Sequence, residues 1–380
     1  MKLFLIAGEP SGDRLGAALM AGLKALEPAV EFAGVGGPAM QAEGLESLFP
    51  MEELSVMGLA EILPKYRALK RRIAQTAAEV LRLSPAALIT IDSPDFCLRV
   101  ARIVREARPD QRVIHYVAPS VWAWRPGRAA KMAKVVDHVL ALLPFEPPYM
   151  EAAGMTCDFV GHPVVAEPLA DRAAAEAFRE ASGIGSAPLL MVLPGSRKGE
   201  VGRLGPRFGA ALERVVAARP ELRVVVPTVP HVAGLVREMT ATWPGRPVVV
   251  EGAAEKRAAF AAADAALAAS GTVSLELAAN RVPMVVAYDF NPLSRAIIGR
   301  MLKLDTVTLV NLVTGTRAVP EFLGKACRPE RIAPAVVRML ADGPERAAQV
   351  AAMADCMVAL GAGGEAPGLR AARSVLAHLG

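Results

Sequence analysis

Residues 189–201 read LLMVLPGSRKGEV: five apolar residues, Leu189–Leu193, are followed by proline, glycine, serine, arginine and lysine. An apolar run without polar alternation is typical of a strand buried on both faces of a parallel sheet. In open parallel sheets, ligands bind just beyond the carboxyl ends of the strands. The stretch therefore predicts a fold class, parallel α/β, and also a place where a ligand binds.

The same pattern recurs along nearly the whole chain, with amphipathic segments of helical length between short apolar runs. Two of the predicted helices are Gly12–Leu26 and Pro94–Arg108. The predicted strands are 2–8, 31–37, 86–92, 112–118, 137–143 and 157–161 in the first half, and 188–195, 222–228, 247–252, 264–270, 282–288 and 306–311 in the second. This alternation predicts parallel sheets with helices on both faces.

Length and local composition divide the chain. At 380 residues it exceeds the size at which one hydrophobic core stops growing, and the segment Gly161–Asp171 contains two prolines and no clear period. We predict two doubly wound Rossmann-like domains, residues 1–163 and 164–366, facing each other across a cleft. A last helix within 367–380 follows the Gly/Pro-rich joint 361–368 and is expected to dock on the N-terminal domain or on a partner subunit.

Charge and cysteine content argue against several classes of protein. The 43 basic and 38 acidic residues give a net charge of +5, which is too mild an imbalance to indicate nucleic-acid binding. The four cysteines are scattered and form no CxxC pair, which argues against a disulfide framework or a thiolate metal site. The N-terminus resembles a first strand more than a signal peptide, so we expect a cytoplasmic protein.

One segment raises the question of a membrane. Residues 65–72, KYRALKRR, hold five basic residues and no acid, directly after the apolar VMGLAEILP. The segment Val56–Arg72 is either a solvated helix face or an interfacial element whose cations meet anionic headgroups. The residues alone leave both interpretations open.

The opening stretch supplies the first candidate site, Gly195, Ser196 and Arg197. Glycine and serine let backbone amides and a hydroxyl approach an oxyanion, and the planar guanidinium of arginine matches phosphate. A nucleotide diphosphate is the predicted ligand, and a basic turn without a ligand is the alternative. The segment matches neither the GxxxxGK[ST] phosphate loop nor the GxGxxG fingerprint.

A second candidate site follows the predicted strand 264–270. Ser270, Gly271 and Thr272 are expected to open a helix, whose first amides point toward a phosphate. Glu276 comes four residues after Thr272, one residue too far for a capping box. We therefore predict that its carboxylate accepts hydrogen bonds from ribose hydroxyl groups.

The N-terminal half offers an acid at the end of a predicted strand. In IDSPDF, residues 91–96, Ser93 is predicted to cap a helix, Pro94 suits its first position, and Asp95 favours its positive end. Asp92 has no such structural task and would face the cleft as a general base. The alternative is an aspartate that merely binds the amides of a turn.

Two other segments are predicted to border the same edge. The segment AGEPSGD supplies Glu9, Ser11 and Asp13, which form either the polar rim of a site or a capped turn. Residues 115–132 supply aromatic and basic side chains that either line an apolar ligand channel or pack the domain: Trp122, Trp124, Arg125, Arg128 and Lys131. Packing is the commoner role of such aromatic residues.

Motifs for metal and hydrolase chemistry are missing from the sequence. The five histidines show neither HExxH nor HxH spacing, and no two aspartates stand at i and i+2. No GxSxG elbow is present. We therefore expect a metal-independent protein without a cofactor.

Ten segments together resemble the lipid-A-disaccharide synthase family, glycosyltransferases of the double-Rossmann GT-B type. They run in the family's order from residue 7 to about residue 313, and PSVWAWR and LPGSR are very specific. The segments are AGEPSGD, MQAEGLESLFPMEELSVMGLAEIL, IDSPDF, HYVAPSVWAWR, LLPFE, FVGHP, LPGSRKGEV, ASGTVSLE, PMVVAY and NLV. The carboxyl third is similar more loosely, and the segment NLVTGTRAVPEFL varies within the family's pattern.

The resemblance implies a reaction in lipid A biosynthesis. The family transfers 2,3-diacylglucosamine from UDP to the 6-hydroxyl of 2,3-diacylglucosamine 1-phosphate, giving a β-1,6 linkage and UDP. The family's proposed base corresponds to Asp92, its important arginine to Arg197 and its important asparagine to Asn311. An α-linked donor and a β product imply a single displacement with inversion, in which Asp92 takes the acceptor proton.

The resemblance also assigns tasks to the domains and a place in the cell. It implies an N-terminal domain that binds the acceptor and faces the membrane, and a C-terminal domain that binds the UDP-sugar. The acceptor side is expected to include Glu9, Ser11, Asp13, Ser120 and Trp122. Family members are peripheral on the cytoplasmic face of the inner membrane, and they can form homodimers by exchanging carboxyl-terminal segments.

Two competing functions remain at this stage. A UDP-GlcNAc 2-epimerase shares the fold and the nucleotide site but acts on UDP-GlcNAc alone. A non-catalytic, nucleotide-regulated protein of the membrane surface would bind UDP and anionic vesicles without releasing UDP from acylated substrates, and would leave Asp92 without a purpose.

Overall fold

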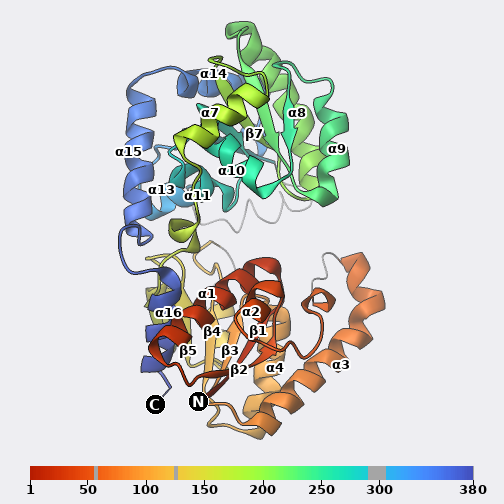
Figure 1. Cartoon of the computed structure of the whole chain (residues 1–380), viewed down its shortest axis with the longest axis vertical. Coiled ribbons are helices and arrows are strands. Elements are labelled where there is room, and N and C mark those ends of the chain that lie inside the picture. The colour runs from red at the N-terminus through yellow and green to blue at the C-terminus, as the bar shows by residue number, and fades with distance from the viewer. Residues whose placement is uncertain (55–58, 124–126, 290–304, 380) are drawn as a thin grey trace. The chain divides into compact units, whose positions relative to one another are not determined.

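The computed structural model describes residues 1–54, 59–123, 127–289 and 305–379; for 59–66 it describes the helical backbone alone (Figure 1). Two parallel sheets of six strands each organise the chain. Their contacts define two compact units, Met1–Ala166 with Leu360–Gly380, and Glu167–Ala359. The predicted class, two doubly wound α/β sheets, is confirmed.

The first unit carries a sheet with the strand order β2-β1-β3-β4-β5-β6. Its strands are β1 (Lys2–Ala7), β2 (Glu31–Val35), β3 (Ala87–Ile91), β4 (Val113–Tyr116), β5 (His138–Ala141) and β6 (Thr156–Phe159). Its helices are α1 (Pro10–Leu26), α2 (Pro38–Ala42), α3 (Leu59–Leu83), α4 (Pro94–Ala107), α5 (Gly127–Met132), α6 (Pro147–Glu151) and α16 (Pro367–Ala377), with short 3-10 turns at Met51–Glu53 and Pro163–Ala166.

The second unit carries a sheet with the strand order β12-β11-β10-β7-β8-β9. Its strands are β7 (Leu189–Leu193), β8 (Arg223–Pro227), β9 (Val248–Val250), β10 (Ala265–Ala268), β11 (Met284–Tyr288) and β12 (Glu321–Leu323). Its helices are α7 (Arg172–Ala181), α8 (Lys198–Ala218), α9 (Pro230–Thr240), α10 (Ala253–Ala262), α11 (Val273–Ala279), α13 (Leu309–Thr314), α14 (Pro329–Leu340) and α15 (Pro344–Ala359), with a 3-10 turn at Gly324–Ala326.

Alternation along β1 shows why its residues are apolar throughout. Phe4 and Ile6 enter the core under α3, α4 and α5, whereas Leu3 and Leu5 enter the core under α1 and α16. Successive side chains of a strand point to opposite faces, so a sheet with helices on both faces needs no polar positions. The same holds for β7, the strand of the opening stretch, whose five residues are all buried.

One predicted strand is wrong. Residues 306–311 lie in a loop and in the start of α13, and the last strand of the second sheet is Glu321–Leu323 instead. The carboxylate Oε1 of Glu321 accepts hydrogen bonds from the backbone amides of Val307 (3.0 Å) and Thr308 (2.6 Å). A side chain thus satisfies the amides that a sheet ladder would otherwise bind, which the β-branched composition of this segment does not reveal.

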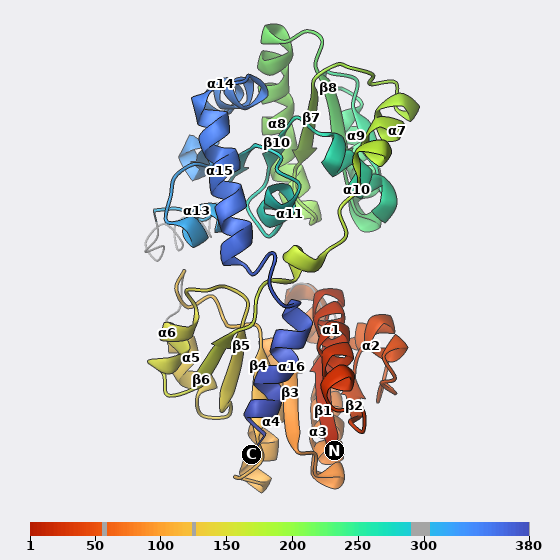
Figure 2. The ribbon, with the colours of Figure 1, turned by 60° about the vertical axis from the view of Figure 1, so that its left-hand side comes forward.

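Helix α16 belongs to the first unit and packs against α1, beside which Figures 1 and 2 both show it. A Cβ on Gly22 would lie 2.6 Å from the carbonyl oxygen of Gly368, so the two glycines allow the helices to approach closely. The division at residues 166–167 falls within the predicted segment Gly161–Asp171, and the chain returns to the first unit at Leu360.

The predicted interfacial segment Val56–Arg72 lies for the most part outside the residues whose side chains the structure describes. At its end, Arg72 makes two hydrogen bonds to Glu53, of 2.8 Å from Nε and 2.6 Å from Nη2. Its guanidinium also lies 4.5 Å from the ring centroid of Phe49. None of the helices in the described part of the chain combines the length and hydropathy that crossing a bilayer requires.

Candidate functional site

A cavity of about 220 Å³ opens in the second unit where β7, β8 and β10 end. The strand order β10-β7-β8 makes these three carboxyl ends neighbours and places the order reversal between β10 and β7, where open α/β sheets bind ligands. Six of the seven residues predicted to bind a nucleotide line the cavity: Gly195, Ser196, Ser270, Gly271, Thr272 and Glu276. Residues from separate segments, each chosen because it follows a predicted strand, thus line one cavity.

The turn after β7 depends on Gly195. Its φ of +111° is in a region that side chains disfavour, and an added Cβ would lie 2.8 Å from the Cβ of Glu200. The turn leads into Ser196, whose carbonyl oxygen accepts a 2.8 Å hydrogen bond from Nε2 of His231. The turn between β7 and the cavity therefore contacts α8 through Glu200 and α9 through His231.

Lys256 and Thr228 also line the cavity, and neither was a candidate from the sequence. Lys256 forms a 2.7 Å ion pair with Glu276, which gives that carboxylate a cationic partner inside the site. The hydroxyl of Thr228 is buried and has no hydrogen-bond partner among the described residues. Thr228 directly follows β8, so the strand-end rule identifies it, whereas Lys256 comes from helix α10 and leaves no such signal.

Arg197 is the predicted residue that does not line the cavity. It occupies the N-cap position of α8, directly after Ser196, and its side chain is 69% exposed. Its Nη1 lies 3.7 Å from Oε1 of Glu200, which also accepts a 3.1 Å hydrogen bond from the hydroxyl of Tyr288. Arg197 is thus an exposed cation that directly follows a cavity residue in the sequence and lies near one carboxylate.

Asn311 is fully buried in α13. Its Oδ1 accepts a 3.0 Å hydrogen bond from the amide of Val319, and its Nδ2 donates to the carbonyl oxygen of Val319 at 3.0 Å and to Oγ1 of Thr306 at 3.2 Å. The side chain therefore clamps the loop that precedes β12. These contacts are with protein groups alone, and the catalytic role of Asn311 stays a prediction.

In the first unit, Asp92 directly follows β3, and both it and Ser93 have positive φ values, +51° and +43°. The order β1-β3-β4 brings Asp92 between the segments that follow the two neighbouring strands, again beside an order reversal. Ser93 takes the predicted N-cap position of α4, but its side chain makes no capping hydrogen bond, because the left-handed backbone turns it elsewhere. A Cβ on Gly8 would lie 2.5 Å from the hydroxyl oxygen of Ser93.

In the segment after β1, Asp13 is buried and bonded to backbone amides, whereas Glu9 and Ser11 are accessible to solvent. Asp13 is 4% exposed, and its carboxylate accepts hydrogen bonds from the amides of Gly37 (2.8 Å), Ala39 (2.9 Å) and Met40 (3.0 Å). These bonds satisfy the start of α2, so Asp13 has a structural role and is not part of the acceptor site proposed below. Glu9 is half-buried and Ser11 is exposed.

The segment after β4 is held by packing. The Trp122 ring meets Phe145 edge-on at 5.2 Å, and its Nε1 donates a 3.3 Å hydrogen bond to Oε1 of Glu146. Burial raises the pKa of Glu146 to about 7, against the opposing effect of hydrogen bonds from Leu143 and Trp122. Glu146, which the sequence analysis did not single out, thus anchors the loop that bears Trp122. Ser120 is exposed, and Trp124 and Arg125 lie outside the described residues.

One group of side chains in the described ranges has the spacing of metal ligands: His138, Asp158 and His378. Both ring nitrogens of His138 already have partners, Thr156 Oγ1 at 2.7 Å and Ser374 Oγ at 2.8 Å. Ser374 in turn donates a 2.6 Å hydrogen bond to Asp158. The group joins α16 to β5 and β6, and no motif in the sequence had indicated it.

Comparison with known proteins gives a full-length match. A sequence model described as lipid-A-disaccharide synthetase matches residues 3–363. The lipid-A-disaccharide synthase of Ruegeria pomeroyi is 64% identical over 100% of this chain and 96% of its own length. That of Rhodospirillum centenum is 53% identical over 98% of this chain and 94% of its own length.

Solved structures share the fold at low sequence identity. A UDP-GlcNAc 2-epimerase from Neisseria meningitidis bound to UDP-GlcNAc gives a TM-score of 0.65 at 11% identity, with 100% of this chain and 99% of that chain covered. The glycotransferase of kitacinnamycin gives a TM-score of 0.62 at 16% identity over 100% and 99% of the two chains. Identities this low show the fold and nothing finer.

Proposed function

The chain belongs to the lipid-A-disaccharide synthase family, and from this premise we propose that it performs the family's reaction in lipid A biosynthesis. UDP-2,3-diacylglucosamine and 2,3-diacylglucosamine 1-phosphate condense to the β-1,6-linked disaccharide 1-phosphate, with release of UDP. The observation that carries this conclusion is the 64% identity over the whole chain, which includes every segment discussed above.

The cavity of the second unit is the proposed donor site. The amides and hydroxyls of Gly195, Ser196 and Ser270–Thr272 would surround the diphosphate, and Lys256 would supply a positive charge beside Glu276. A buried hydroxyl without a partner costs free energy, and a ligand that hydrogen-bonds to it recovers that cost. We therefore include Thr228 among the residues that bind UDP.

The edge of the first sheet that bears Asp92 is the proposed acceptor side. Asp92 is the general base, and Glu9, Ser11, Ser120 and Trp122 come from segments that follow the neighbouring strands β1 and β4. Glu146 acts on Trp122 as a positioning residue through their hydrogen bond. This assignment keeps four of the five predicted acceptor residues.

The proposed reaction is a single displacement with inversion at the anomeric carbon. The Asp92 carboxylate takes the proton from the acceptor 6-hydroxyl as its oxygen attacks, and the bond to the UDP oxygen breaks. Arg197 swings from Glu200 to the departing diphosphate, and Lys256 stabilises the same charge from inside the cavity. In this proposal these two cations neutralise the leaving group in a metal-independent reaction.

Asn311 takes part as a positioning residue. Its three hydrogen bonds fix the segment between α13 and β12, the edge strand beside β11. Its loss would leave the amide and carbonyl of Val319 buried without partners, which is costly. In this proposal Asn311 affects the reaction through the position of this segment and not through contact with the substrate.

We also propose that the protein works as a peripheral protein on the cytoplasmic face of the inner membrane. The basic run 65–72 supports attraction to anionic lipids, as does the acylated nature of both substrates. A homodimer is a further proposal, in which the joint 361–368 lets α16 pack on α1 of a second copy as it packs on its own. Light scattering of the purified chain tests this.

Two assays separate this function from its rivals. With UDP-GlcNAc alone, an epimerase produces the 2-epimer, which proton NMR detects, whereas we expect no change. With UDP-2,3-diacylglucosamine, we expect UDP release that depends on the monosaccharide 1-phosphate. UDP release without the acceptor, or none with it, contradicts the proposal, and the latter together with UDP binding supports a non-catalytic binding protein.

A further inference from the structure

A second and larger cavity lies within the first unit, between α4 and α5. Its volume is about 710 Å³, which is within the range of sites that bind small molecules. Pro94 and Asp95 at the start of α4 and Pro119 after β4 form one end of it. None of the residues that we assign to the acceptor side so far lines it, so its purpose is unexplained.

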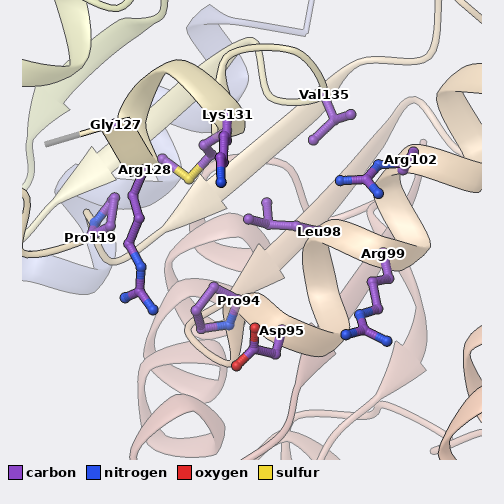
Figure 3. A pocket seen from close by; sticks show the side chains of 11 residues that line it. Pro94, Asp95, Leu98, Arg99, Arg102, Pro119, Gly127, Arg128, Lys131 and Val135 are labelled. Carbon is purple, nitrogen blue, oxygen red and sulfur yellow. The ribbon is translucent and has the colours of Figure 1, made fainter. Parts of the chain in front are cut away.

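The charged side chains around this cavity are predominantly cationic. Figure 3 shows two of them extending from α5 toward α4 and two more along α4. The four basic residues are Arg99, Arg102, Arg128 and Lys131, and the single acidic one is Asp95. Like charges gathered around one hollow repel one another, and an anion bound between them removes that cost.

Three of these cations are available for a ligand. Arg99, Arg102 and Lys131 are exposed and make no ion pair or hydrogen bond with any side chain in the described part of the chain. Other arginines of the same unit have carboxylate partners: Arg105 pairs with Asp137 at 2.7 Å and Arg82 with Glu79 at 2.5 Å. No protein carboxylate therefore competes with a ligand for Arg99, Arg102 and Lys131 in the described part of the chain.

The floor between the cations is apolar. Leu98 from α4 lies opposite Met132 and Val135 from the α5 segment, and the two prolines close one end. No aromatic side chain is among the lining residues that the structure describes, which argues against stacking on a nucleobase. Cations around an apolar floor fit a phosphorylated amphiphile better than a free nucleotide.

The lining of the cavity begins close to the proposed base in the sequence. Asp92 precedes Pro94 by two residues, and β3 and β4, which lead to the two ends of the cavity wall, are neighbours in the sheet. We propose that this cavity binds the phosphate group of the acceptor, 2,3-diacylglucosamine 1-phosphate, and so places its 6-hydroxyl at Asp92. The inference rests on the proposed function and adds to it the residues that select a phosphorylated acceptor.

The physical reason is that phosphate and hydroxyl belong to one sugar ring. Two arginines that hold the phosphate restrict the positions open to the 6-hydroxyl, which converts binding energy into orientation. A phospholipid headgroup carries the same phosphate chemistry, so the test must separate a substrate site from a membrane-docking site.

The test is the double substitution Arg99→Ala/Arg102→Ala, with Lys134→Ala as control. Lys134 is exposed, stands next to Val135 in the sequence and does not line the cavity. The measured quantity is the ratio of kcat/KM for the phosphorylated acceptor to that for 2,3-diacylglucosamine without phosphate. We expect the double variant to lose roughly tenfold or more of this ratio, because charge-assisted hydrogen bonds are lost.

Companion measurements decide between the explanations. The double variant should keep the wild-type Kd for UDP, which also reports that it folds, and its binding to phosphatidylglycerol vesicles should be unchanged. An unchanged ratio in an active enzyme overturns this inference and leaves the proposed function standing. Loss of vesicle binding with an unchanged ratio overturns it in favour of a phospholipid site. A wild-type enzyme that forms no disaccharide contradicts the proposed function itself.

Discussion

Asp92 combines a strand-end position with an unusual backbone. Its φ of +51° and that of Ser93, +43°, place two consecutive non-glycine residues in the left-handed region. Such conformations cost free energy and are retained where the surrounding structure holds a side chain for a task. The unusual backbone at Asp92 therefore supports its proposed role as general base. The sequence suggested this role because Asp92, unlike Ser93 and Asp95, has no task in capping the helix.

Replacement of this carboxylate tests its role as base. In Asp92→Asn the proton acceptor is lost while the side-chain volume is kept, so turnover should fall about 10²- to 10⁴-fold with UDP affinity unchanged. Steady-state kinetics measures the turnover, and calorimetry measures the affinity for UDP. The control is Asp110→Asn, an exposed aspartate at the opposite edge of the sheet. Wild-type turnover by Asp92→Asn would falsify the base assignment.

The donor cavity makes a different residue-scale prediction at Arg197. Removal of its cation in Arg197→Ala should weaken UDP binding about 10- to 100-fold, the range of a hydrogen bond to a charged group. Its exposed neighbour Lys198, replaced by alanine, serves as the control. Equal UDP affinities of wild type and Arg197→Ala in calorimetry would reject the phosphate contact.

Thr228 gives the sharpest test of the cavity itself. Thr228→Val removes a buried hydroxyl that has no partner in the described residues, so the ligand-free protein should be as stable as wild type or more so. UDP affinity should nevertheless fall about 2- to 10-fold, because one neutral hydrogen bond to the ligand is lost. A variant that is destabilised without UDP, or binds it as wild type does, disagrees with this role.

The sequence allowed much of the lining of the cavity in the second unit to be predicted, and less of the side-chain packing in the first unit. Residues that directly follow strands were found because the chemistry of a parallel sheet concentrates there, as for Ser196 and Ser270. Lys256 lies in helix α10, and the sequence does not distinguish it from a lysine on a solvent-exposed helix face. For Asp13 the sequence left a polar rim and a capped turn open, and only the tertiary structure shows that its carboxylate binds amides at the start of α2.

At the scale of elements, β-strand propensity gave a wrong prediction at residues 306–311. Their β-branched composition predicts a strand, yet Glu321, more than ten residues away, binds the amides of this segment. Periodicity succeeded for the other strands, because burial on both faces of a sheet leaves an apolar signature that does not depend on distant partners. Long-range side-chain capping has no comparable signature.

The packing of α16 on α1 yields a prediction about stability. Gly22→Ala and Gly368→Ala should each destabilise the protein by about 1–3 kcal/mol, because each added methyl would overlap a backbone carbonyl of the other helix. Differential scanning calorimetry measures the loss. The control is Gly234→Ala in α9, where no atom lies within 4 Å of the added Cβ, and a gain of up to about 1 kcal/mol is expected. Equal effects at all three sites would contradict the close approach.

At the scale of the whole molecule, buried histidines predict acid sensitivity. Burial lowers the pKa of His115, His138 and His162 to about 4, against about 6.5 in an unfolded chain. Between these values the unfolded chain binds more protons, so the stabilising effect is complete above pH 6.5 and is lost as the pH falls toward 4. The melting temperature should decline over this window.

Glu146 has the opposite effect on the pH dependence of stability, so its replacement tests this prediction. Burial raises its pKa to about 7, so its native state binds the extra proton, and its contribution to stability is lost as the pH rises from about 4.5 to 7. In Glu146→Gln this opposing slope disappears, and the melting temperature should fall more steeply on acidification than in wild type. Parallel curves for the two proteins would show that Glu146 is not buried as described.

The central claim is that Asp92 and the cavity at the end of β7 take part in the same transfer of one acylated sugar to another. Mass spectrometry of the purified protein incubated with UDP-2,3-diacylglucosamine and 2,3-diacylglucosamine 1-phosphate measures this directly. We predict a tetra-acyl disaccharide monophosphate that appears in step with UDP. Unchanged substrates, or UDP without the disaccharide, would contradict the claim.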